Sequence, residues 1–398
     1  MTIEQAIAAA MRRNPELAAT RVDVGVRAAR AVQAGLRPNP TLGFEAEDVA
    51  GSDRRAGWEA GQTTLSVSQA LELGGKRQKR RRTANLERDV ASWDIVVRLR
   101  ALVSEVRKAF AATLIAQDRL TLSEKLIRIA EDSVRSVGVT VDAGAVSPVE
   151  RLRAEVNLSR ARASRLAARR ELENARSILA ATWGEPSPLF ERAAGALSPA
   201  VRPAPLETLL PNIGKIPDLA RADAEIEQRR AALSLEQSRR IPDLSLVAGG
   251  RHYAEDGGGA LVFGFSLPLP LFDRNQGNIL AAAREVAQAR LAHDAVAVTV
   301  EARARQAYVA VEAAAEQASI FRDETIPRAE RAYAGAKDGY ARGLFRYLEV
   351  LDAQRTLFEL RAEYLTALAT YYDASAELSR WVEHSDTSPE RAHGDRHD

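Results

Sequence analysis

The chain of 398 residues contains no cysteine, which excludes disulfides, thiolate metal sites and cysteine lipidation. It also lacks any run of about 20 consecutive apolar residues, so we expect no transmembrane helix. Aromatic residues make up only 5% of the sequence, whereas hydrophobic residues make up 46% and charged residues 28%. This composition is typical of a water-compatible, helix-rich chain.

No strong charge of one sign is present either, because the formal net charge is only +2. Lys and Arg alternate with Asp and Glu, apart from one basic run over 76–82, so we expect no nucleic-acid partner. The N-terminus shows no basic, apolar and small-residue signal pattern, and Thr2 and Gln5 instead have capping-box spacing for a helix over 3–12. Either an export signal has been removed or the protein is not exported.

The sequence repeats itself at long range. The string over 14–17, Asn-Pro-Glu-Leu, returns 202 positions later as Ile-Pro-Asp-Leu over 216–219, and Trp183 corresponds to Trp381. A repeat of this length sets the architecture. We therefore predict two structural repeats, over 1–199 and 200–383, followed by a polar tail over 384–398 that we expect to be disordered.

Each predicted repeat has the order helix, strand pair, very long helix, turn, long helix. The first contains a β-hairpin at about 41–73 and long helices at about 76–137 and 147–183. The second contains a β-hairpin at about 243–271 and long helices at about 275–341 and 346–383.

The segment from 76 to about 137 contains no proline and predicts a rod of about 90 Å, which needs support from neighbouring helices. A seven-residue spacing of mostly apolar positions supplies that support and predicts coiled-coil packing. These positions are Leu99, Val106, Thr113, Leu120, Ile127 and Val134. In the second repeat Pro327 interrupts the long helix, so we expect a kink or break near Thr325.

Two segments between the helices alternate apolar and polar residues with period two, which predicts strands. Each segment holds two strands, and each strand is about ten residues long, enough to cross a bilayer at a tilt. Four strands cannot close a membrane barrel, so other protomers must complete the edges. The residues expected to face lipid are Phe44, Leu65, Val67, Phe263 and Phe265. The alternative is a small exposed sheet that caps a coiled coil.

Three strings carry a family resemblance: the Asn-Pro-Glu-Leu opening, Leu-Glu-Leu-Gly-Gly-Lys-Arg over 71–77, and Pro-Leu-Phe-Asp-Arg-Asn-Gln over 270–276. Together with the double repeat they resemble the TolC family of outer-membrane efflux channels, from residue 2 to about 383. The last two strings look most like its heavy-metal, cobalt-zinc-cadmium subgroup.

The resemblance implies a mainly α fold with a small membrane β part. It implies a homotrimer with a twelve-stranded barrel in outer-membrane lipid and a periplasmic tube of twelve coiled helices. In the family, the tip of this tube docks on the periplasmic adaptor of an inner-membrane pump, often of the resistance-nodulation-division class. Such a channel is a passive conduit, here for heavy-metal cations. The alternatives are a drug-efflux or type I secretion channel and a soluble coiled-coil structural or interaction protein.

The family's tip lies at the two helix–helix turns, and we expect both turns to serve adaptor docking. In the first turn glycine ends one helix, Ser147 caps the next and Glu150 completes a capping box, as in any helical hairpin. The expected docking residues are Gly144, Ser147, Pro148, Glu150, Gly343, Leu344 and Arg346.

Beyond the second turn, Glu349 and Asp352 are three residues apart and share one helix face. Threefold symmetry would gather three copies of each, and rings of carboxylates attract cations. In the family, acidic residues at this stretch form the periplasmic aperture, although Phe345 stands where some members have a gate-bonding Arg. The alternative is an acidic first helical turn favoured by the helix dipole.

No catalytic constellation is visible, so we predict neither an enzyme nor a cofactor site. The five histidines do not pair with acidic residues at metal-ligand spacing. His393 and His397 are four apart but lie in the polar tail, so we assign no metal site there. The glycines over 257–259 fit a hairpin loop better than a phosphate-binding loop.

Overall fold

The computed structural model describes residues 1–49 and 60–382, and the polar tail predicted over 384–398 lies outside them. The chain forms two compact units, each built from both halves of the sequence. The helical unit comprises Met1–Ala19, Ile95–Pro217 and the chain from Ala297 onward, and the sheet unit comprises Thr20–Asp94 and Asp218–Val296.

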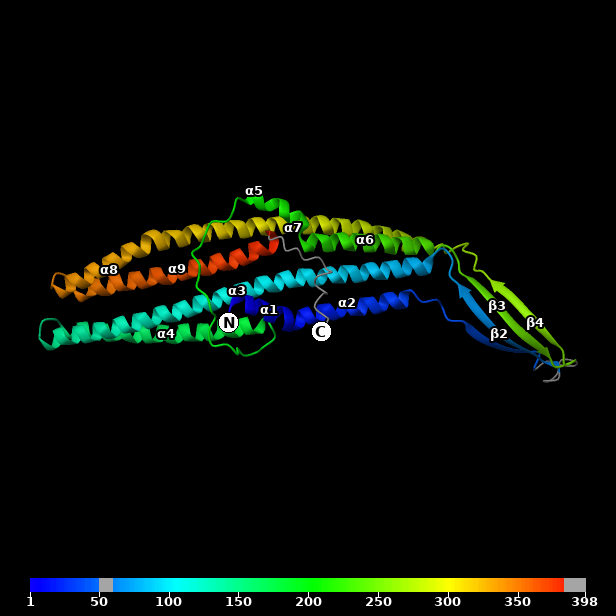
Figure 1. Cartoon of the computed structure of the whole chain (residues 1–398), viewed down its shortest axis with the longest axis horizontal. Helices are drawn as coiled ribbons and strands as arrows, with labels where there is room; N and C mark the ends of the chain where they lie inside the picture. Colours follow the sequence, from blue (N-terminus) through cyan, green and yellow to red (C-terminus); the bar gives the residue numbers. More distant parts are fainter. Residues whose placement is uncertain (50–59, 383–398) are drawn as a thin grey trace. The chain divides into compact units, whose positions relative to one another are not determined.

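The same order of elements occurs twice (Figure 1). The first half contains α1 (Ile3–Arg13), α2 (Pro15–Ala34), β1 (Thr41–Glu47), β2 (Gln62–Leu71), α3 (Lys76–Asp142) and α4 (Pro148–Ala181). The second half contains α5 (Leu206–Leu209), a 3-10 helix (Leu210–Lys215), α6 (Pro217–Ser238), β3 (Leu244–Tyr253), β4 (Gly259–Ser266), α7 (Gln276–Ile320), a π-helical turn (Phe321–Thr325), α8 (Ile326–Ala341) and α9 (Tyr347–Val382).

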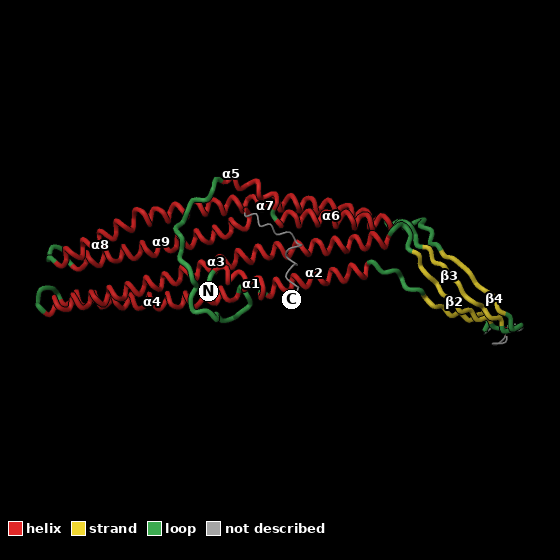
Figure 2. The backbone as a smooth tube through the Cα atoms, in the orientation of Figure 1, coloured by secondary structure: helices red, strands yellow, loops and turns green. Residues whose placement is uncertain are grey.

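In the sheet unit the strands form one antiparallel sheet with the order β1-β2-β3-β4. The two hairpins are joined through β2 and β3, with Leu65 opposite Gly250. Among the described residues β1 and β4 each have a strand neighbour on one side only. The predicted fold class is confirmed: residues 1–49 and 60–382 are mainly helical and carry four strands in an unclosed sheet (Figure 2).

The helical unit contains two long helical hairpins, α3–α4 and α8–α9, whose turns lie at the same end (Figure 1). The predicted heptad positions face its interior: Val106, Thr113 and Ile127 are buried, and the remaining three are half-buried. On α4, alanines at 154, 161, 168 and 175 are buried at seven-residue intervals, so neighbouring helices can approach closely.

The disturbance predicted near Thr325 is a π-helical turn over Phe321–Thr325 and not a break. Pro327 has no backbone N–H to donate, which removes one bond of the regular helical pattern. The Ile326 amide instead donates to the carbonyl of Phe321, and α8 continues from there.

The capping prediction holds for α1, where Thr2 and Gln5 form a complete capping box. It is wrong in part for α4. The Ser147 hydroxyl accepts from the amide of Val149, while the amide of Glu150 donates to the backbone carbonyl of Ser147. Because this backbone bond already uses the amide that a capping box would need, Glu150 completes none.

No helix in the described ranges is long and apolar enough to cross a membrane.

Candidate functional site

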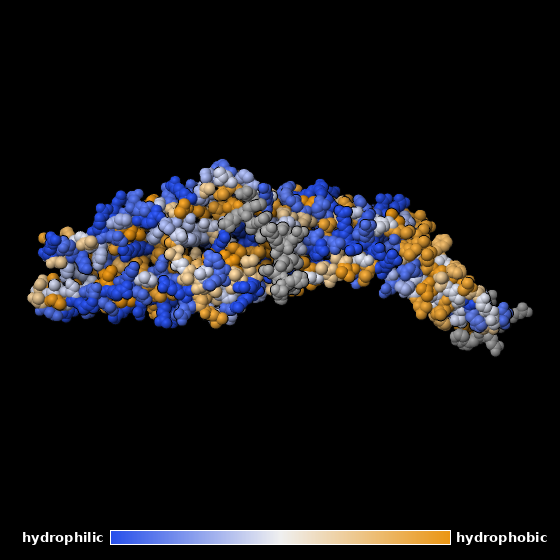
Figure 3. Space-filling view, viewed as in Figure 1, coloured by the Kyte–Doolittle hydropathy of each residue, from blue (hydrophilic) through white to orange (hydrophobic). Residues whose placement is uncertain are grey.

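One face of the sheet is apolar and exposed. Residues directly opposite in an antiparallel sheet share a face, and Phe44 pairs with Leu65, Val67 with Ala248, and Ala248 with Phe263. Phe44 is 68% exposed, and Phe263 and Phe265 are each 76% exposed. Figure 3 shows this apolar surface along the strands. All five residues predicted to face lipid lie on it.

The opposite face is polar and hydrogen-bonded. Arg251 makes three contacts there: Nε donates to Thr64 Oγ1 over 2.8 Å, one terminal nitrogen donates to Gln62 Oε1 over 3.0 Å, and the guanidinium pairs with Glu47 over 3.0 Å. A sheet with one apolar and one polar face suits an apolar phase on one side and water on the other.

The polar face is also crowded at its centre, where Gly43, Ser66 and Gly249 form one cross-strand row. A Cβ added at Gly249 would lie 2.4 Å from the Leu65 carbonyl oxygen and 2.9 Å from the Ser66 Cα. Only glycine therefore allows β2 and β3 to approach each other here.

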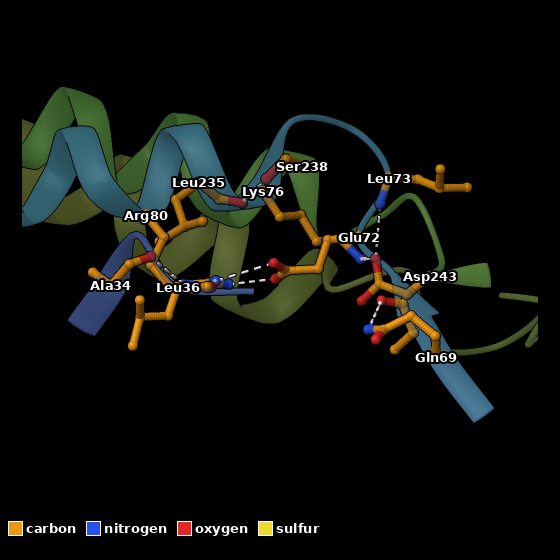
Figure 4. A network of polar contacts seen from close by, with 11 residues as sticks. Ala34, Leu36, Gln69, Glu72, Leu73, Lys76, Arg80, Leu235, Ser238 and Asp243 are labelled. Atoms are coloured by element: carbon orange, nitrogen blue, oxygen red, sulfur yellow. Dashed lines mark hydrogen bonds and ion pairs between the residues drawn. The ribbon is translucent and has the colours of Figure 1, made fainter. Parts of the chain in front are cut away.

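The end of β2 is fixed to the start of α3 by a polar network in the sheet unit (Figure 4). Asp243 Oδ1 accepts from the Leu73 amide over 3.0 Å and from Lys76 Nζ over 2.7 Å. Arg80 makes two bonds to the Glu72 carboxylate, and its Nε donates to the Ala34 carbonyl over 2.9 Å. The hydrogen bonding of the Arg80 guanidinium to the Glu72 carboxylate raises the pKa of Arg80 above its usual value.

Two of the strings that carry the family resemblance therefore build strand–helix junctions. In the first, Gly74 and Gly75 have φ of +69° and +71°, a left-handed backbone that favours glycine. In the second, Asn275 has φ of 60° and its side-chain amide donates to the Glu236 carbonyl over 2.9 Å. The sequence could not reveal the Lys76–Asp243 contact, because its partners are 167 positions apart.

The two helix–helix turns share one backbone design. Gly144 and Gly343 have φ of +73° and +74°. The amide after each glycine donates to the carbonyl five residues earlier: Ala145 to Thr140 over 3.0 Å, and Leu344 to Gly339 over 2.8 Å. These are Schellman motifs, which satisfy the last carbonyls of a helix.

Close to these turns α3, α4, α8 and α9 share a buried cluster that includes Val137, Ala154, Ala336, Tyr347 and Val350. Tyr347 is only 2% exposed, and burial raises the pKa of its hydroxyl. The cluster ties the two hairpins together, while the predicted docking residues Leu344 and Arg346 remain exposed.

Glu349 and Asp352 lie on the exposed side of α9, opposite the buried Tyr347 and Val350. Neither carboxylate forms an ion pair within the described part of the chain. One turn later, Arg355 is held by Glu359 over 2.6 Å. The pKa of Arg355 is raised by that hydrogen bond and, to a smaller extent, by the charge of Asp352. The structure thus places both acids together on one accessible surface.

Histidines contribute no metal site among residues 1–49 and 60–382, where no group of three or more His, Asp or Glu side chains could hold an ion. His293 lies between Asp223 and Asp294 at 3.5 and 3.3 Å. His393 and His397, in the predicted tail, lie outside the described residues.

Comparison with known proteins decides the family. The family model described as "Outer membrane efflux protein" matches residues 6–185 and 213–382. The chain belongs to the outer membrane efflux protein family. It is 33% identical over 381 residues to the cobalt-zinc-cadmium resistance protein CzcC of Cupriavidus metallidurans. This alignment covers 96% of this chain and 89% of that protein.

Solved structures agree on the fold. CusC aligns with a TM-score of 0.80 at 19% identity, covering 96% of this chain and 92% of that one. The outer membrane protein VceC of Vibrio cholerae aligns with a TM-score of 0.78 at 18% identity, covering 96% and 95%. These structures give the chain a TolC-like fold. The family match makes it an outer-membrane efflux protein, located in the outer membrane with an extension into the periplasm. Proteins of this family are channels.

Proposed function

We propose that three copies of this chain form one passive channel that carries heavy-metal cations from the periplasm to the outside. The observation that carries the proposal is the four-stranded sheet, which has an exposed apolar face and two edges. Unpaired strand edges in a hydrocarbon layer cost several kcal/mol per exposed backbone group, by the order of magnitude for unsatisfied polar groups. Pairing β1 of one copy with β4 of the next removes that cost.

The apolar face then contacts lipid through Phe44, Leu65, Val67, Phe263 and Phe265, and the Arg251 network faces the water-filled interior. A soluble coiled-coil protein would leave these large side chains in water without compensation. The exposed phenylalanines of β1 and β4 therefore favour the membrane channel over that alternative.

The cargo proposal is supported by two relatives that the chain resembles in sequence. CzcC is a cobalt-zinc-cadmium resistance protein, and a further relative from Alcaligenes xylosoxydans xylosoxydans, 27% identical over 299 residues, is a nickel-cobalt-cadmium resistance protein. Drug efflux and type I secretion remain the alternative cargo classes, because a wide aqueous tube needs few specific contacts.

The energy must come from partners. We propose that the two Schellman turns dock on a periplasmic adaptor, which connects the channel to an inner-membrane pump of the resistance-nodulation-division class. The support is that both turns share one left-handed backbone conformation, at Gly144 and Gly343, and expose side chains such as Leu344.

We further propose that Glu349 and Asp352 line the periplasmic aperture. In a trimer they bring up to six carboxylates toward one axis, where mutual repulsion must be offset by cations or neighbouring arginines. Their shared exposure on α9 and the nearby Arg355 support this placement.

Recordings in planar lipid bilayers test the conduit and the aperture together. The wild-type protein should conduct ions without any energy source and should prefer cations. Changing Glu349 and Asp352 to Ala should lower the preference for cations and the block by multivalent cations, while trimers still form because exposed helix charges contribute little to stability.

A matched control changes Glu155 on α4 and Glu363 on α9 to Ala; both are exposed and form no ion pair in the described part of the chain, and this variant should keep the wild-type selectivity. If the Glu349 and Asp352 variant conducts with unchanged selectivity and block, the aperture lies elsewhere. If the wild-type protein inserts but never conducts, the channel proposal itself is wrong.

A further inference from the structure

The charges of the sheet unit are distributed unevenly along the strands. β1 and β3 begin, and β2 and β4 end, at the same end of the antiparallel sheet, so all four helix–strand junctions meet there. The segments 34–40, 72–82, 236–243 and 273–276 contain ten Lys and Arg residues but only four acidic ones. This surplus of six positive charges stands out in a chain whose net charge is +2.

The four acidic side chains at these junctions are already engaged. Glu72 is bound by Arg80, Asp243 by Lys76, and Glu236 by Arg239. Asp273 Oδ1 accepts from the Asn275 amide over 2.8 Å. Six exposed arginines are left with no ion pair among the described residues, and we call them the basic collar: Arg37, Arg77, Arg81, Arg82, Arg240 and Arg274.

The other end of the sheet has the opposite character. Five of its six charged residues in the described part of the chain are acidic: Glu45, Glu47, Asp48, Glu255 and Asp256, against Arg251. The sheet therefore has a basic end next to the helices and an acidic end at its loops. General solubility would not require that separation.

Exposed apolar residues lead directly into the basic collar. Leu269, Leu271 and Phe272 follow β4, and Phe272 is 90% exposed. β2 has ten residues, which at about 3.3 Å each and a tilt of about 40° span roughly 25 Å, the height of the apolar band of a membrane barrel. The collar then lies where hydrocarbon gives way to lipid headgroups.

We propose that the basic collar binds the phosphate groups of anionic phospholipids in the periplasmic leaflet of the outer membrane. This inference rests on the proposed membrane position of the sheet. Each exposed guanidinium offers paired donors that match phosphate oxygens. The aliphatic stem of Arg81 lies against Gly35, so its charged end extends outward from an apolar base, as interfacial arginines do. The collar thereby fixes how deeply the channel sits in the membrane.

The test uses the full chain reconstituted in phosphatidylcholine vesicles that contain a trace of spin-labelled phosphatidylglycerol or spin-labelled phosphatidylcholine. Electron paramagnetic resonance reports the fraction of each label that the protein immobilises. The wild-type protein should prefer phosphatidylglycerol. Changing Arg77, Arg81 and Arg82 to Gln should reduce that preference by about fivefold or more. Each arginine next to an anionic membrane surface strengthens binding by a factor of about that size.

The control variant changes Arg153, Arg160 and Arg165 to Gln; these α4 arginines are also exposed and have no ion pair in the described ranges. It should keep the wild-type preference. An unchanged preference in the Arg77, Arg81 and Arg82 variant, or an equal loss in the control, overturns the collar proposal. If the wild-type chain does not enter vesicles at all, the proposed channel function fails; if it enters and conducts without lipid preference, only the collar fails.

Discussion

Placing arginine at Val67 and Phe263 should abolish assembly of the protein in the outer membrane. The two residues lie in one cross-strand row with Ala248, at the middle of the apolar face. A lipid-facing arginine near mid-bilayer costs about 2–4 kcal/mol. Each chain of the variant carries two of them, so the total cost grows with every copy in the assembly. The measurement is the amount of oligomer in isolated outer-membrane fractions, detected on unheated gels.

The control places arginine at Ser68 and Ser266, which lie on the polar face of the same strands. This variant carries the same added charge and should assemble at a level close to wild type. Normal assembly of the Val67 and Phe263 variant would show that this face does not contact lipid.

The second large effect concerns two neighbouring glycines of β3. Gly249→Ala should prevent stable pairing of β2 with β3, because the new Cβ would meet backbone atoms of Leu65 and Ser66 that cannot move aside as a side chain can. Gly250→Ala should behave like wild type, since nothing lies within 4 Å of its added Cβ. Overpacking of this kind costs about 1–3 kcal/mol or more per chain.

The urea concentration at which oligomers dissociate in detergent measures this difference. We expect a clearly lower midpoint, or no oligomer, for Gly249→Ala and an unchanged midpoint for Gly250→Ala. Equal midpoints for the two variants would contradict the close approach of β2 and β3 at Gly249.

Much of the fold could be predicted because its signals are periodic and local. The seven-residue spacing from Leu99 to Val134 indicated the long packed helix, and the alternation around Phe44 and Phe263 indicated the strands and their apolar face. Glycine in the turns at 144 and 343 marked the ends of helices because a left-handed backbone there favours it.

Contacts between distant segments could not be predicted in the same way. The pairing of β2 with β3 joins residues such as Leu65 and Gly250, and no local pattern specifies that register. The junction strings were visible as motifs, yet their partner Asp243 was not. The capping box at Ser147 was a reasonable expectation from spacing, but the Glu150 amide bonds to the backbone instead.

The candidate site could likewise be predicted only in part. Sequence alone placed Glu349 and Asp352 on one helix face, and the structure adds that this face is exposed and that Arg355 stands one turn away. The basic collar was visible only in part, as the run over 76–82. Arg37, Arg240 and Arg274 join it because an antiparallel sheet brings all four junctions to one end.

The most direct test of the central claim is the metal content of cells that retain the pump and adaptor but lack the outer-membrane channel. Such cells, loaded with cobalt, zinc or cadmium, are compared with and without this chain by elemental mass spectrometry. Restoring the wild-type chain should lower the retained metal, and the variant with arginine at Val67 and Phe263 should not. Unchanged metal content, with the wild-type protein assembled in the outer membrane, would contradict a metal-exporting channel.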